Sequence, residues 1–266
     1  MRQGVTRETR SQSQNGVEVC GVPRWKRWLD LTTIFIFSPV LVFVAILVSV
    51  YIKVVSRGPL LFRQDRTGMN AKPFRCLKFR SMKVDADHAA HQHLMQELIH
   101  SDRSMTKLDN DGDPRVIPGG RWLRATGLDE LPQLINVLRG EMSLVGPRPC
   151  TTYEFIHLTP FDYERFNAAP GLTGLWQVSG KNRTTFREMV DLDIYYCRHL
   201  SPAMDLKILA MTPLTVLSQL VDLIVNRWKR SIRRNGKKQF KVLSIHKSEH
   251  RKLNWTYEGE PRGRCQ

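Results

Sequence analysis

An uninterrupted apolar segment near the start of the chain restricts the fold more than any other feature. Residues 31–52 read LTTIFIFSPVLVFVAILVSVYI and contain no charged side chain. As a helix rising about 1.5 Å per residue, the segment is about 33 Å long, enough to cross a hydrocarbon core of about 30 Å. It is too long for the apolar core of a signal peptide, and no small-residue cleavage site follows it. The segment therefore predicts a membrane-embedded helix.

Two features bear on whether this helix crosses the membrane or enters and returns. Both flanks are basic, although a spanning helix is typically basic on one side only. The flanking cations are Arg24, Lys26 and Arg27 before the segment and Lys53, Arg57, Arg63 and Arg66 after it. Within it, Pro39 cannot donate to the carbonyl of Phe35 and kinks a helix, while the Ser38 hydroxyl can satisfy part of the freed backbone. A kinked spanning helix and a hairpin broken at this pair fit these residues equally well.

The net charge of +16 is concentrated at the two ends of the chain. Residues 227–266 hold 13 basic and 3 acidic side chains, residues 1–28 hold 6 and 2, and the part between is nearly balanced. Residues 1–23 lack periodicity and are typical of a disordered tail. We expect the basic tail 227–266 to contact anionic lipid headgroups, a solvated tail being the alternative. No folded nucleic-acid motif accompanies the charge, so we expect no nucleic-acid partner.

Composition excludes several classes of protein. Hydrophobic residues make up 41% and charged residues 25% of the chain, which excludes collagen-like and wholly disordered chains. Five scattered cysteines are an odd number without a CxxC pair, so neither a disulfide framework nor a zinc site is expected. Reduced thiols indicate a domain that faces the cytoplasm.

Periodicity and turn residues predict the main elements around the apolar segment. Residues 74–81 have strand-like content, and residues 84–100 predict a helix. His88 and His91 on that helix could align two metal ligands, but no acidic or cysteine partner clearly shares their face, so we favour a solvated helix. Residues 109–120 predict a loop, since the glycine and distal glutamate of an EF-hand are absent.

Residues 129–140, DELPQLINVLRG, give the clearest helical signal. Asp129 suits an N-cap, Pro132 suits the first turn, and Gly140 suits the end of the helix. Apolar residues recur at the spacing of one helical stripe, at Leu131, Leu134, Ile135 and Leu138. The pattern predicts a short helix with Asp129 and Glu130 at its positive end, which would keep Asp129 ionised.

Residues 201–226 begin with Ser201-Pro202, an N-cap followed by proline in the first turn. The apolar residues that follow are interrupted by Pro213, Gln219 and Asp222. The segment is too polar to span comfortably and favours an interfacial helix lying on the bilayer. A buried core helix is the alternative.

The adjacent carboxylates Asp129 and Glu130 are the sharpest indication of chemistry, although a simple preference for acidic residues at a helix start is the alternative. Basic groups and turns accompany them: Arg124, Arg148 within VGPRP, Lys78 and Arg80 on the predicted strand, and the glycine-rich run PGLTGLWQVSGKN at 170–182. Small residues in that run permit a close backbone approach to a ligand. A carboxylate can attack phosphorus, a divalent ion can neutralise phosphate oxygens, and Arg or Lys can stabilise transition-state charge. The set favours phosphoryl transfer, and the adjacent membrane helix implies a lipid phosphate as one substrate.

Long motifs over residues 26–225, about three quarters of the chain, resemble the bacterial sugar transferases, the monotopic polyprenyl-phosphate phosphoglycosyltransferases. The matching stretches are KRWLD…SP (26–39), CLKFRSM (76–82), DPR (113–115), LR.TGLDELPQLINVLRGEMSLVGPRP (123–149), PGLTGLWQVSGKN (170–182), DLDIYY (191–196) and LSPAMDLKILAMTP (200–213). The resemblance implies a helix-rich α+β fold with a small β element and amphipathic interfacial helices. It implies a re-entrant helix, residues 24–58, broken at Ser38-Pro39, ahead of a catalytic domain, residues 59–226, on the cytoplasmic face of the bacterial inner membrane.

The same resemblance implies a reaction. A sugar 1-phosphate passes from a UDP-sugar to undecaprenyl phosphate with release of UMP, as the first membrane step of exopolysaccharide or another surface glycan, ahead of downstream glycosyltransferases. The form LTGLWQVSGKN is similar to members that transfer galactose 1-phosphate or glucose 1-phosphate. Asp129 is implied as the nucleophile that forms a covalent phosphosugar, and Mg²⁺ is expected at Asp129 and Glu130. Glu130 is implied to position that ion or the lipid phosphate.

The remaining site residues follow from the resemblance with alternatives left open. Arg148, Arg124 and Lys78 are assigned to phosphate binding, although each could pair with a structural carboxylate instead. Gln177 and Asn182 are assigned to the sugar or the uridine.

The departures from the family pattern are small. Gly127 replaces a frequent serine, Lys181 replaces a frequent arginine, and we expect none of the multi-span domain that precedes this region in larger members. A membrane-tethered basic binding or scaffold protein without turnover is the alternative function.

Overall fold

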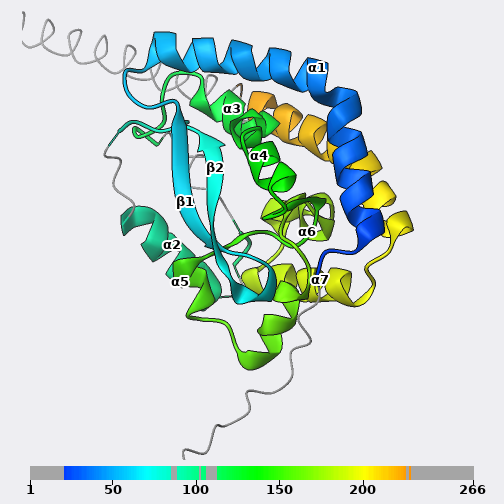
Figure 1. The fold of residues 1–266 in the computed structure, drawn as a ribbon. Coiled ribbons are helices and arrows are strands. Elements are labelled where there is room, and N and C mark those ends of the chain that lie inside the picture. The colour runs from blue at the N-terminus through cyan, green and yellow to red at the C-terminus, as the bar shows by residue number, and fades with distance from the viewer. Residues whose placement is uncertain (1–20, 85–88, 102, 106–112, 226–227, 229–266) are drawn as a thin grey trace, which may run out of the picture. The chain divides into compact units, whose positions relative to one another are not determined.

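The computed structural model describes residues 21–84, 89–101, 103–105, 113–225 and 228 (Figure 1). These residues form a helix-rich α+β fold, as the resemblance implied. They fall into two units, the first ending at Thr215 and the second beginning at Val216. The predicted tail 1–23 lies outside the described residues except for positions 21–23, and the tail 227–266 lies outside them except for Trp228.

Short helices and strands make up most of the first unit. The α-helices are α1 (Arg24–Val55), α2 (Ala89–Ile99), α3 (Gly120–Thr126), α4 (Gln133–Leu138), α5 (Thr152–Phe155), α6 (Leu175–Val178) and α7 (Phe186–Arg198). The 3₁₀ helices are η1 (Met69–Ala71), η3 (Leu128–Glu130), η4 (Pro160–Asn167) and η5 (Lys181–Arg183). The strands are β1 (Leu61–Thr67), β2 (Pro73–Phe79), β3 (Ser143–Val145), β4 (Cys150–Thr151) and β5 (Gly171–Thr173). A last helix, Pro202–Val225, follows α7.

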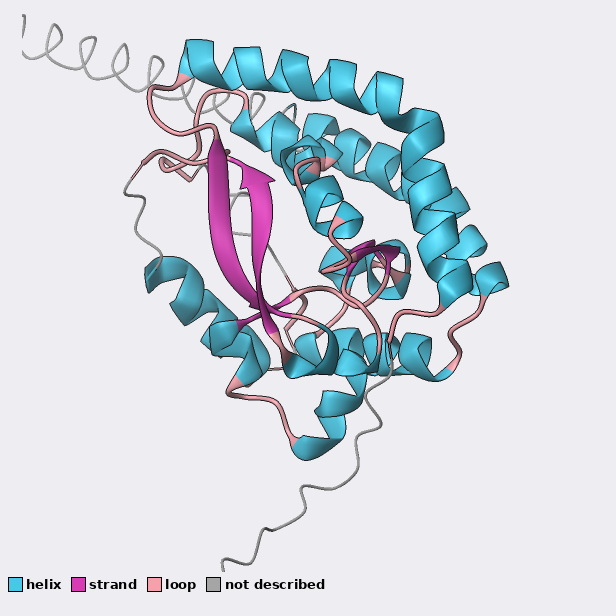
Figure 2. Cartoon of the chain, viewed as in Figure 1, coloured by secondary structure: helices cyan, strands magenta, loops and turns pink. Residues whose placement is uncertain are grey.

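An antiparallel hairpin of β1 and β2 lies among the helices (Figure 2). It confirms the predicted strand, and α4 and η3 pack on β2 whereas α5 packs on β1. Gln64 is paired with Cys76 and Phe62 with Lys78, and side chains alternate along a strand, so these residues and Arg66 share one face of the hairpin. β4 extends this sheet beside β1, while β3 and β5 form a separate parallel pair.

Helix α1 turns a corner within the apolar segment (Figure 1). Pro39 lies inside the helix, and the Ser38 hydroxyl donates to the Phe35 carbonyl at 2.8 Å, as the sequence predicted. The side chains around the corner are exposed and apolar: Phe35, Ile36, Phe37, Val40, Val42, Phe43, Ile46 and Leu47. The middle of the helix is therefore exposed, while its two ends contact the folded unit.

The N-terminal end of α1 is fixed by buried charges. Lys26 is 1% exposed and donates to Asp205 at 2.5 Å and to the Tyr196 hydroxyl at 2.9 Å. Asp30 accepts from Ser143 Oγ at 3.0 Å and from the Leu144 amide at 2.9 Å. Lys26, one of the basic residues that flank the apolar segment, therefore forms an internal ion pair.

The C-terminal end of α1 packs on the same unit. Val48 and Ile52 belong to an apolar cluster with Phe79, Ile117 and Leu123. The Tyr51 hydroxyl lies 3.1 Å from the Pro118 carbonyl and donates to it. Both ends of α1 thus contact one folded unit, the first through α4 and β3 and the second through the hairpin and α3.

The helix Pro202–Val225 starts where the sequence predicted, since Ser201 Oγ accepts from the Met204 amide at 3.4 Å. Its residues include several exposed apolar side chains: Leu206, Met211, Leu214, Leu217, Val221, Ile224 and Val225. The alternative of a buried core helix is therefore wrong. By length and composition this helix, like α1, is long and apolar enough to cross a membrane, and its expected place at the interface stays a prediction.

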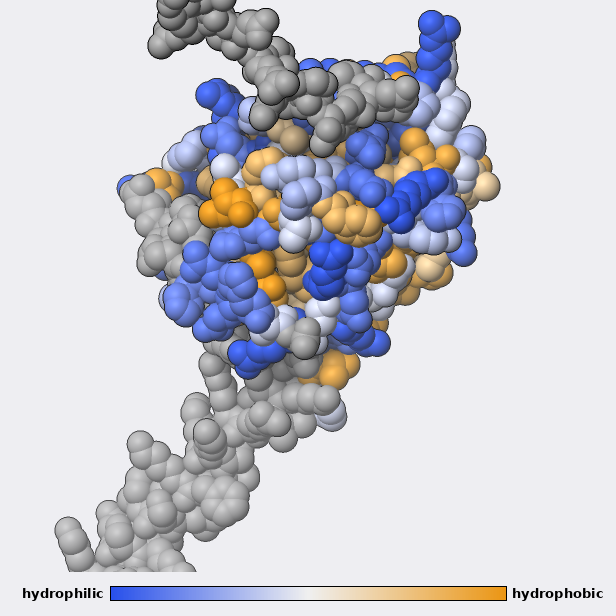
Figure 3. Space-filling view, turned by 90° about the horizontal axis from the view of Figure 1, so that it is seen from below, coloured by the Kyte–Doolittle hydropathy of each residue, from blue (hydrophilic) through white to orange (hydrophobic). Residues whose placement is uncertain are grey.

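The opposite side of the molecule has a different surface. Figure 3 shows the face away from the C-terminal half of α1, where hydrophilic side chains predominate and apolar ones form small separate patches. The largest set of exposed apolar side chains belongs to α1.

Candidate active site

The two adjacent carboxylates lie beside strand β2, in the turn η3. Asn136 on α4 holds this region against the strand: its Oδ1 accepts from the Leu77 amide at 3.0 Å and its Nδ2 donates to the Arg75 carbonyl at 2.8 Å. Lys78 reaches across from β2 and donates to Glu130 Oε1 at 2.8 Å. The structure therefore brings together Asp129, Glu130 and Lys78, as the predicted site required.

The local conformation of Asp129 differs from the prediction. α4 begins at Gln133, so Asp129 lies in the preceding 3₁₀ turn and is not an N-cap. The cause is Gly127, whose φ of +72° is favourable for glycine and reverses the chain before the turn. Asp129 is 8% exposed, whereas the Glu130 side chain is 37% exposed. The turn presents one sheltered and one accessible carboxylate.

The predicted apolar stripe of this helix is only partly internal. Gln133, Asn136 and Val137 are the buried residues of α4, while Ile135 and Leu138 are 40% and 50% exposed. Asn136 is buried because it holds α4 to strand β2 by hydrogen bonds. Periodicity alone therefore indicated the wrong face.

Lys181 is a member of this cluster that sequence reasoning noted only as a departure from the family. Burial lowers the pKa of its ammonium, and the nearby carboxylates Glu130 and Asp129 oppose that shift. The charges of Lys78 and Arg148 lower it further. Lys181 follows Gly180 in a conformation with φ of +42°, which turns the chain here. The signal available in the sequence was a lysine in the glycine-rich run.

Arg148 is paired with the buried carboxylate of Glu154, which was the alternative to phosphate binding. Its Nη1 donates to Glu154 Oε1 at 2.9 Å and Oε2 at 3.0 Å, and its guanidinium lies 5.9 Å from the Trp176 ring centre. Burial raises the pKa of the Cys76 thiol, which also senses Lys78, Arg66, Glu130 and Arg148. Lys78, Glu130, Arg66 and Arg148 are therefore all near enough to act on one buried thiol.

Arg124 lies close enough to Asp113 to act on that carboxyl group, and its assignment to phosphate binding stays a prediction. Hydrogen bonding from Arg115 lowers the pKa of the Asp113 carboxyl group to about 2, and the charge of Arg124 contributes to that shift. Arg115 donates to Asp113 through its Nε at 2.9 Å and its Nη2 at 2.8 Å. The predicted loop at 109–120 is confirmed from Asp113 onward, and residues 109–112 lie outside the described part.

The glycine-rich run packs on the molecule's own backbone. A Cβ at Gly171 would lie 2.1 Å from the Gly146 amide nitrogen, and one at Gly174 would lie 2.1 Å from the Gly146 carbonyl oxygen. These glycines are required by the close approach of two chain segments, not by a ligand. Gln177 lies on α6 beside this contact, and its buried Oε1 has no hydrogen-bond partner within the described residues. Asn182 lies in η5, and its side chain is outside the description.

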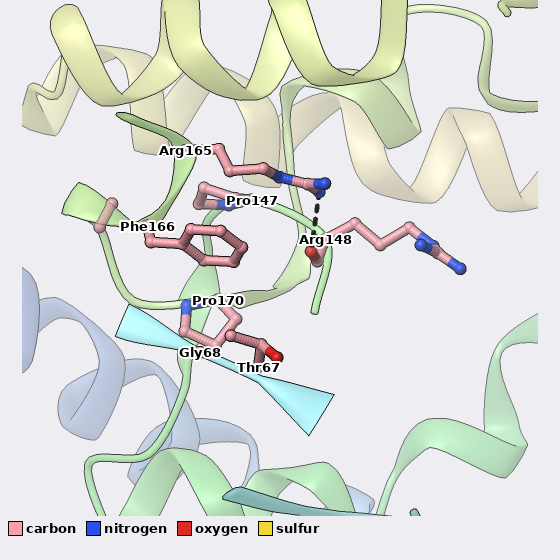
Figure 4. Close-up of a pocket in the computed structure, with 8 residues that line it drawn as sticks. Thr67, Gly68, Pro147, Arg148, Arg165, Phe166 and Pro170 are labelled. Atoms are coloured by element: carbon pink, nitrogen blue, oxygen red, sulfur yellow. Dashed lines mark hydrogen bonds between the residues drawn. The ribbon is translucent and has the colours of Figure 1, made fainter. Parts of the chain in front are cut away.

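A small crevice lies on the other side of the PRP segment (Figure 4). Its lining includes Thr67, Pro147, Arg165 and Phe166, and the Arg148 guanidinium points away from it. Neither Asp129 nor Glu130 lines it. The crevice is therefore separate from the carboxylate site.

The donor set at Asp129 and Glu130 suits Mg²⁺. No group of three or more His, Cys, Asp or Glu side chains that could hold a metal ion occurs within the residues described. The side chains of His88 and His91, for which the sequence favoured a solvated helix over a metal site, lie outside the description. Mg²⁺ is commonly bound by one or two carboxylates together with substrate phosphates and water. Two adjacent carboxylates, one accessible, fit that mode.

The Glu154 carboxylate should make stability depend on pH. Burial is outweighed by Arg148 and the other cations around it, which lower its pKa from 4.5 to about 2. A carboxyl group whose pKa is lowered in the folded state stabilises the fold at pH values above its pKa in the unfolded chain. This stabilisation is lost as the pH falls through the folded-state pKa. We expect the wild type to exceed Glu154→Gln in unfolding free energy, with this advantage shrinking by about 3 kcal/mol between pH 5 and pH 2. Denaturation in detergent across that range checks it, and a constant difference would contradict it.

Comparison with known proteins shows the family to which the chain belongs. The model of the family described as "Bacterial sugar transferase" matches residues 22–219, and the chain belongs to that family. It is 41% identical over 193 residues to the galactosyl transferase CpsE of Streptococcus agalactiae, covering 72% of this chain. It is 41% identical over 168 residues to the undecaprenyl-phosphate galactose phosphotransferase of Salmonella typhimurium, covering 60% of this chain. It is 38% identical over 201 residues to the UDP-glucose:undecaprenyl-phosphate glucose-1-phosphate transferase of Caulobacter vibrioides, covering 73% of this chain.

The matched regions occupy different shares of these relatives. The chain spans 42% of the length of CpsE, 34% of the Salmonella protein and 70% of the Caulobacter protein. Membership of the family rests on the match over residues 22–219.

Proposed function

We propose that this chain transfers a hexose 1-phosphate from a UDP-sugar to undecaprenyl phosphate and releases UMP. The observation that carries the proposal is the meeting of Asp129 and Glu130 with Lys78 beside an apolar helix whose two ends contact the same unit. The names of the Salmonella and Caulobacter relatives support the carrier lipid, and they favour galactose or glucose as the sugar.

In the proposed first step, a carboxylate oxygen of Asp129 attacks the β-phosphorus of the UDP-sugar. The bond between that phosphorus and the oxygen bridging to UMP breaks, and UMP leaves with the electron pair. In the second step, an oxygen of undecaprenyl phosphate attacks the same phosphorus and the Asp129 carboxylate is restored. The product is a lipid diphosphate sugar, and the two steps form a ping-pong sequence.

The neighbouring side chains have separate roles in this proposal. Lys78 holds Glu130 and adds positive charge where phosphate oxygens gather. Among the described residues, Arg148 bonds Glu154 through Nη1, and we assign a phosphate contact to the rest of its guanidinium. Lys181 adds a further charge beside Asp129. Asp129 and Glu130 would hold Mg²⁺, which supplies charge neutralisation of the phosphate oxygens when bound.

We propose further that α1 enters the inner membrane and returns to the cytoplasmic side. Its ends contact one unit while the side chains around Pro39 are exposed and apolar, which favours a hairpin over a straight span. The helix Pro202–Val225 would lie at the interface, and the basic tail would meet anionic lipids.

Labelling with a membrane-impermeant maleimide tests this topology. In a background with Cys20 and Cys265 replaced by serine, we expect Trp28→Cys and Arg57→Cys, both exposed, to react only from the cytoplasmic side. Phe37→Cys at the corner should react from neither side. Reaction of Trp28→Cys from the periplasm would contradict the hairpin.

UMP release with undecaprenyl phosphate and a panel of UDP-sugars tests the reaction. We expect turnover with UDP-galactose or UDP-glucose that exceeds other UDP-sugars by about tenfold or more. The lipid product should contain the sugar and both phosphates. Binding of UDP-sugars without any UMP release would favour the scaffold alternative instead.

A further inference from the structure

The backbone of the PRP segment is held at each of its three carbonyl groups. The Pro147 carbonyl accepts from the Gly171 amide at 2.8 Å. The Arg148 carbonyl accepts from Arg165 Nη2 at 3.2 Å, as Figure 4 shows. The Pro149 carbonyl accepts from Arg66 Nη1 at 2.9 Å. Because two prolines also restrict the backbone, the start of the Arg148 side chain is fixed in direction.

Arg66 is the anchor with the most complete set of contacts. Its side chain is 9% exposed and lies on the hairpin face that carries Cys76 and Lys78. Its Nε and Nη2 both donate to Gln64 Oε1, at 3.1 and 2.8 Å. Each edge of the guanidinium is therefore committed, one to Gln64 and the other to Pro149. The sequence showed Arg66 only as one of the basic residues that follow the apolar segment.

This arrangement also places two like charges together. Burial lowers the pKa of Arg66, the charge of Arg148 lowers it further, and Glu154 opposes that shift. A second cation beside Arg148 costs free energy through repulsion of like charges. The presence of arginine at position 66 therefore indicates that its hydrogen-bonding geometry is needed there. Only arginine offers the planar fork that bonds Gln64 and Pro149 at once.

We propose that Arg66 is a positioning residue for the transfer reaction, fixing the Pro149 carbonyl and through it the direction of the Arg148 guanidinium. This inference rests on the proposed function. Arg66 touches no substrate in this scheme. Its hydrogen bond to Pro149 links strand β1 to the segment that contains Arg148.

The test compares Arg66→Lys with Arg75→Lys. Arg75 is matched because it lies on the same hairpin, on the opposite face, in an exposed pair with Asp65 at 3.8 Å. We expect Arg66→Lys to lower kcat by about 10²-fold, with KM for the UDP-sugar changed less than about threefold, because a misdirected group affects the transition state most. Arg75→Lys should keep wild-type values. Equal kcat in both variants would overturn the proposal.

A double-variant comparison separates positioning from a general loss of stability. If Arg66 acts through Arg148, adding Arg66→Lys to Arg148→Ala should lower kcat by less than about twofold further. Multiplication of the two separate losses would overturn the proposal. Gln64→Met provides a second variant should Arg66→Lys fail to fold, since it removes one anchor of the guanidinium, and we expect it to lower kcat by about tenfold.

Hydrogen exchange gives a readout independent of turnover. In Arg66→Lys, amides in residues 143–155 should exchange at least about tenfold faster than in Arg75→Lys, because the Pro149 anchor is lost. A wild type that releases no UMP would refute the proposed function while this exchange result still reports on the anchor. Unchanged exchange would overturn the inference alone.

Discussion

Asp129→Asn is expected to abolish sugar-phosphate transfer, lowering kcat by about 10⁴-fold or more. Asparagine has nearly the shape of aspartate but lacks the anionic oxygen that attacks phosphorus in the proposed first step. Asp129 is 8% exposed in the turn η3, so the replacement should leave the surrounding packing intact. UMP release by purified protein in detergent measures the loss.

The matched control for this prediction is Asp65→Asn. Asp65 lies on the outer face of the hairpin with its side chain 77% exposed, so activity should equal that of the wild type. Thermal unfolding of both variants should occur within a few degrees of the wild type. An Asp129→Asn protein that keeps even a tenth of wild-type turnover would show that the chemistry does not pass through this carboxylate.

Lys26→Met is expected to have the largest effect on stability, about 3–5 kcal/mol of unfolding free energy. The replacement leaves the Asp205 carboxylate buried without its cation, at a site where both side chains are 1% exposed. Tyr196 donates to Asp205 at 2.6 Å and cannot neutralise it, since burial and that carboxylate already raise the tyrosine pKa. Chemical denaturation in detergent measures the change.

Two further variants serve as the control and the rescue for Lys26→Met. Arg24→Met removes an exposed cation two residues away and should cost under about 0.5 kcal/mol. The double variant Lys26→Met with Asp205→Leu should recover most of the loss, because no unpaired charge remains. Equal stability of Lys26→Met and Arg24→Met would contradict the account of this buried pair.

The sequence predicted the secondary structure best where local rules act alone. Pro39 and Ser38 set the corner of α1, and Ser201 caps the last helix, because each depends on atoms within one turn. The start of α4 was misplaced because the positive φ of Gly127 and the following 3₁₀ turn are not encoded in apolar periodicity. Asn136 is fully buried for the same kind of reason, since its partners come from a distant strand.

The site could be predicted in outline from its motifs, but its pairings could not. Lys78 joins Glu130 across 52 residues of sequence, and no spacing rule encodes that contact. Lys26 and Arg66 looked like membrane-flanking cations because charge and position along the chain were the only information available. Their burial depends on Asp205 and Pro149, which lie far away in the sequence. Pairing over long separations is a tertiary property that a single sequence does not display.

Mass spectrometry of the intact intermediate tests the central claim most directly. Purified protein is incubated with its active UDP-sugar and without undecaprenyl phosphate, then quenched and digested. The account predicts a hexose phosphate on the peptide that contains Asp129, formed with one equivalent of UMP and lost when undecaprenyl phosphate is added. An unmodified peptide in a preparation that releases UMP and forms the lipid product would contradict it.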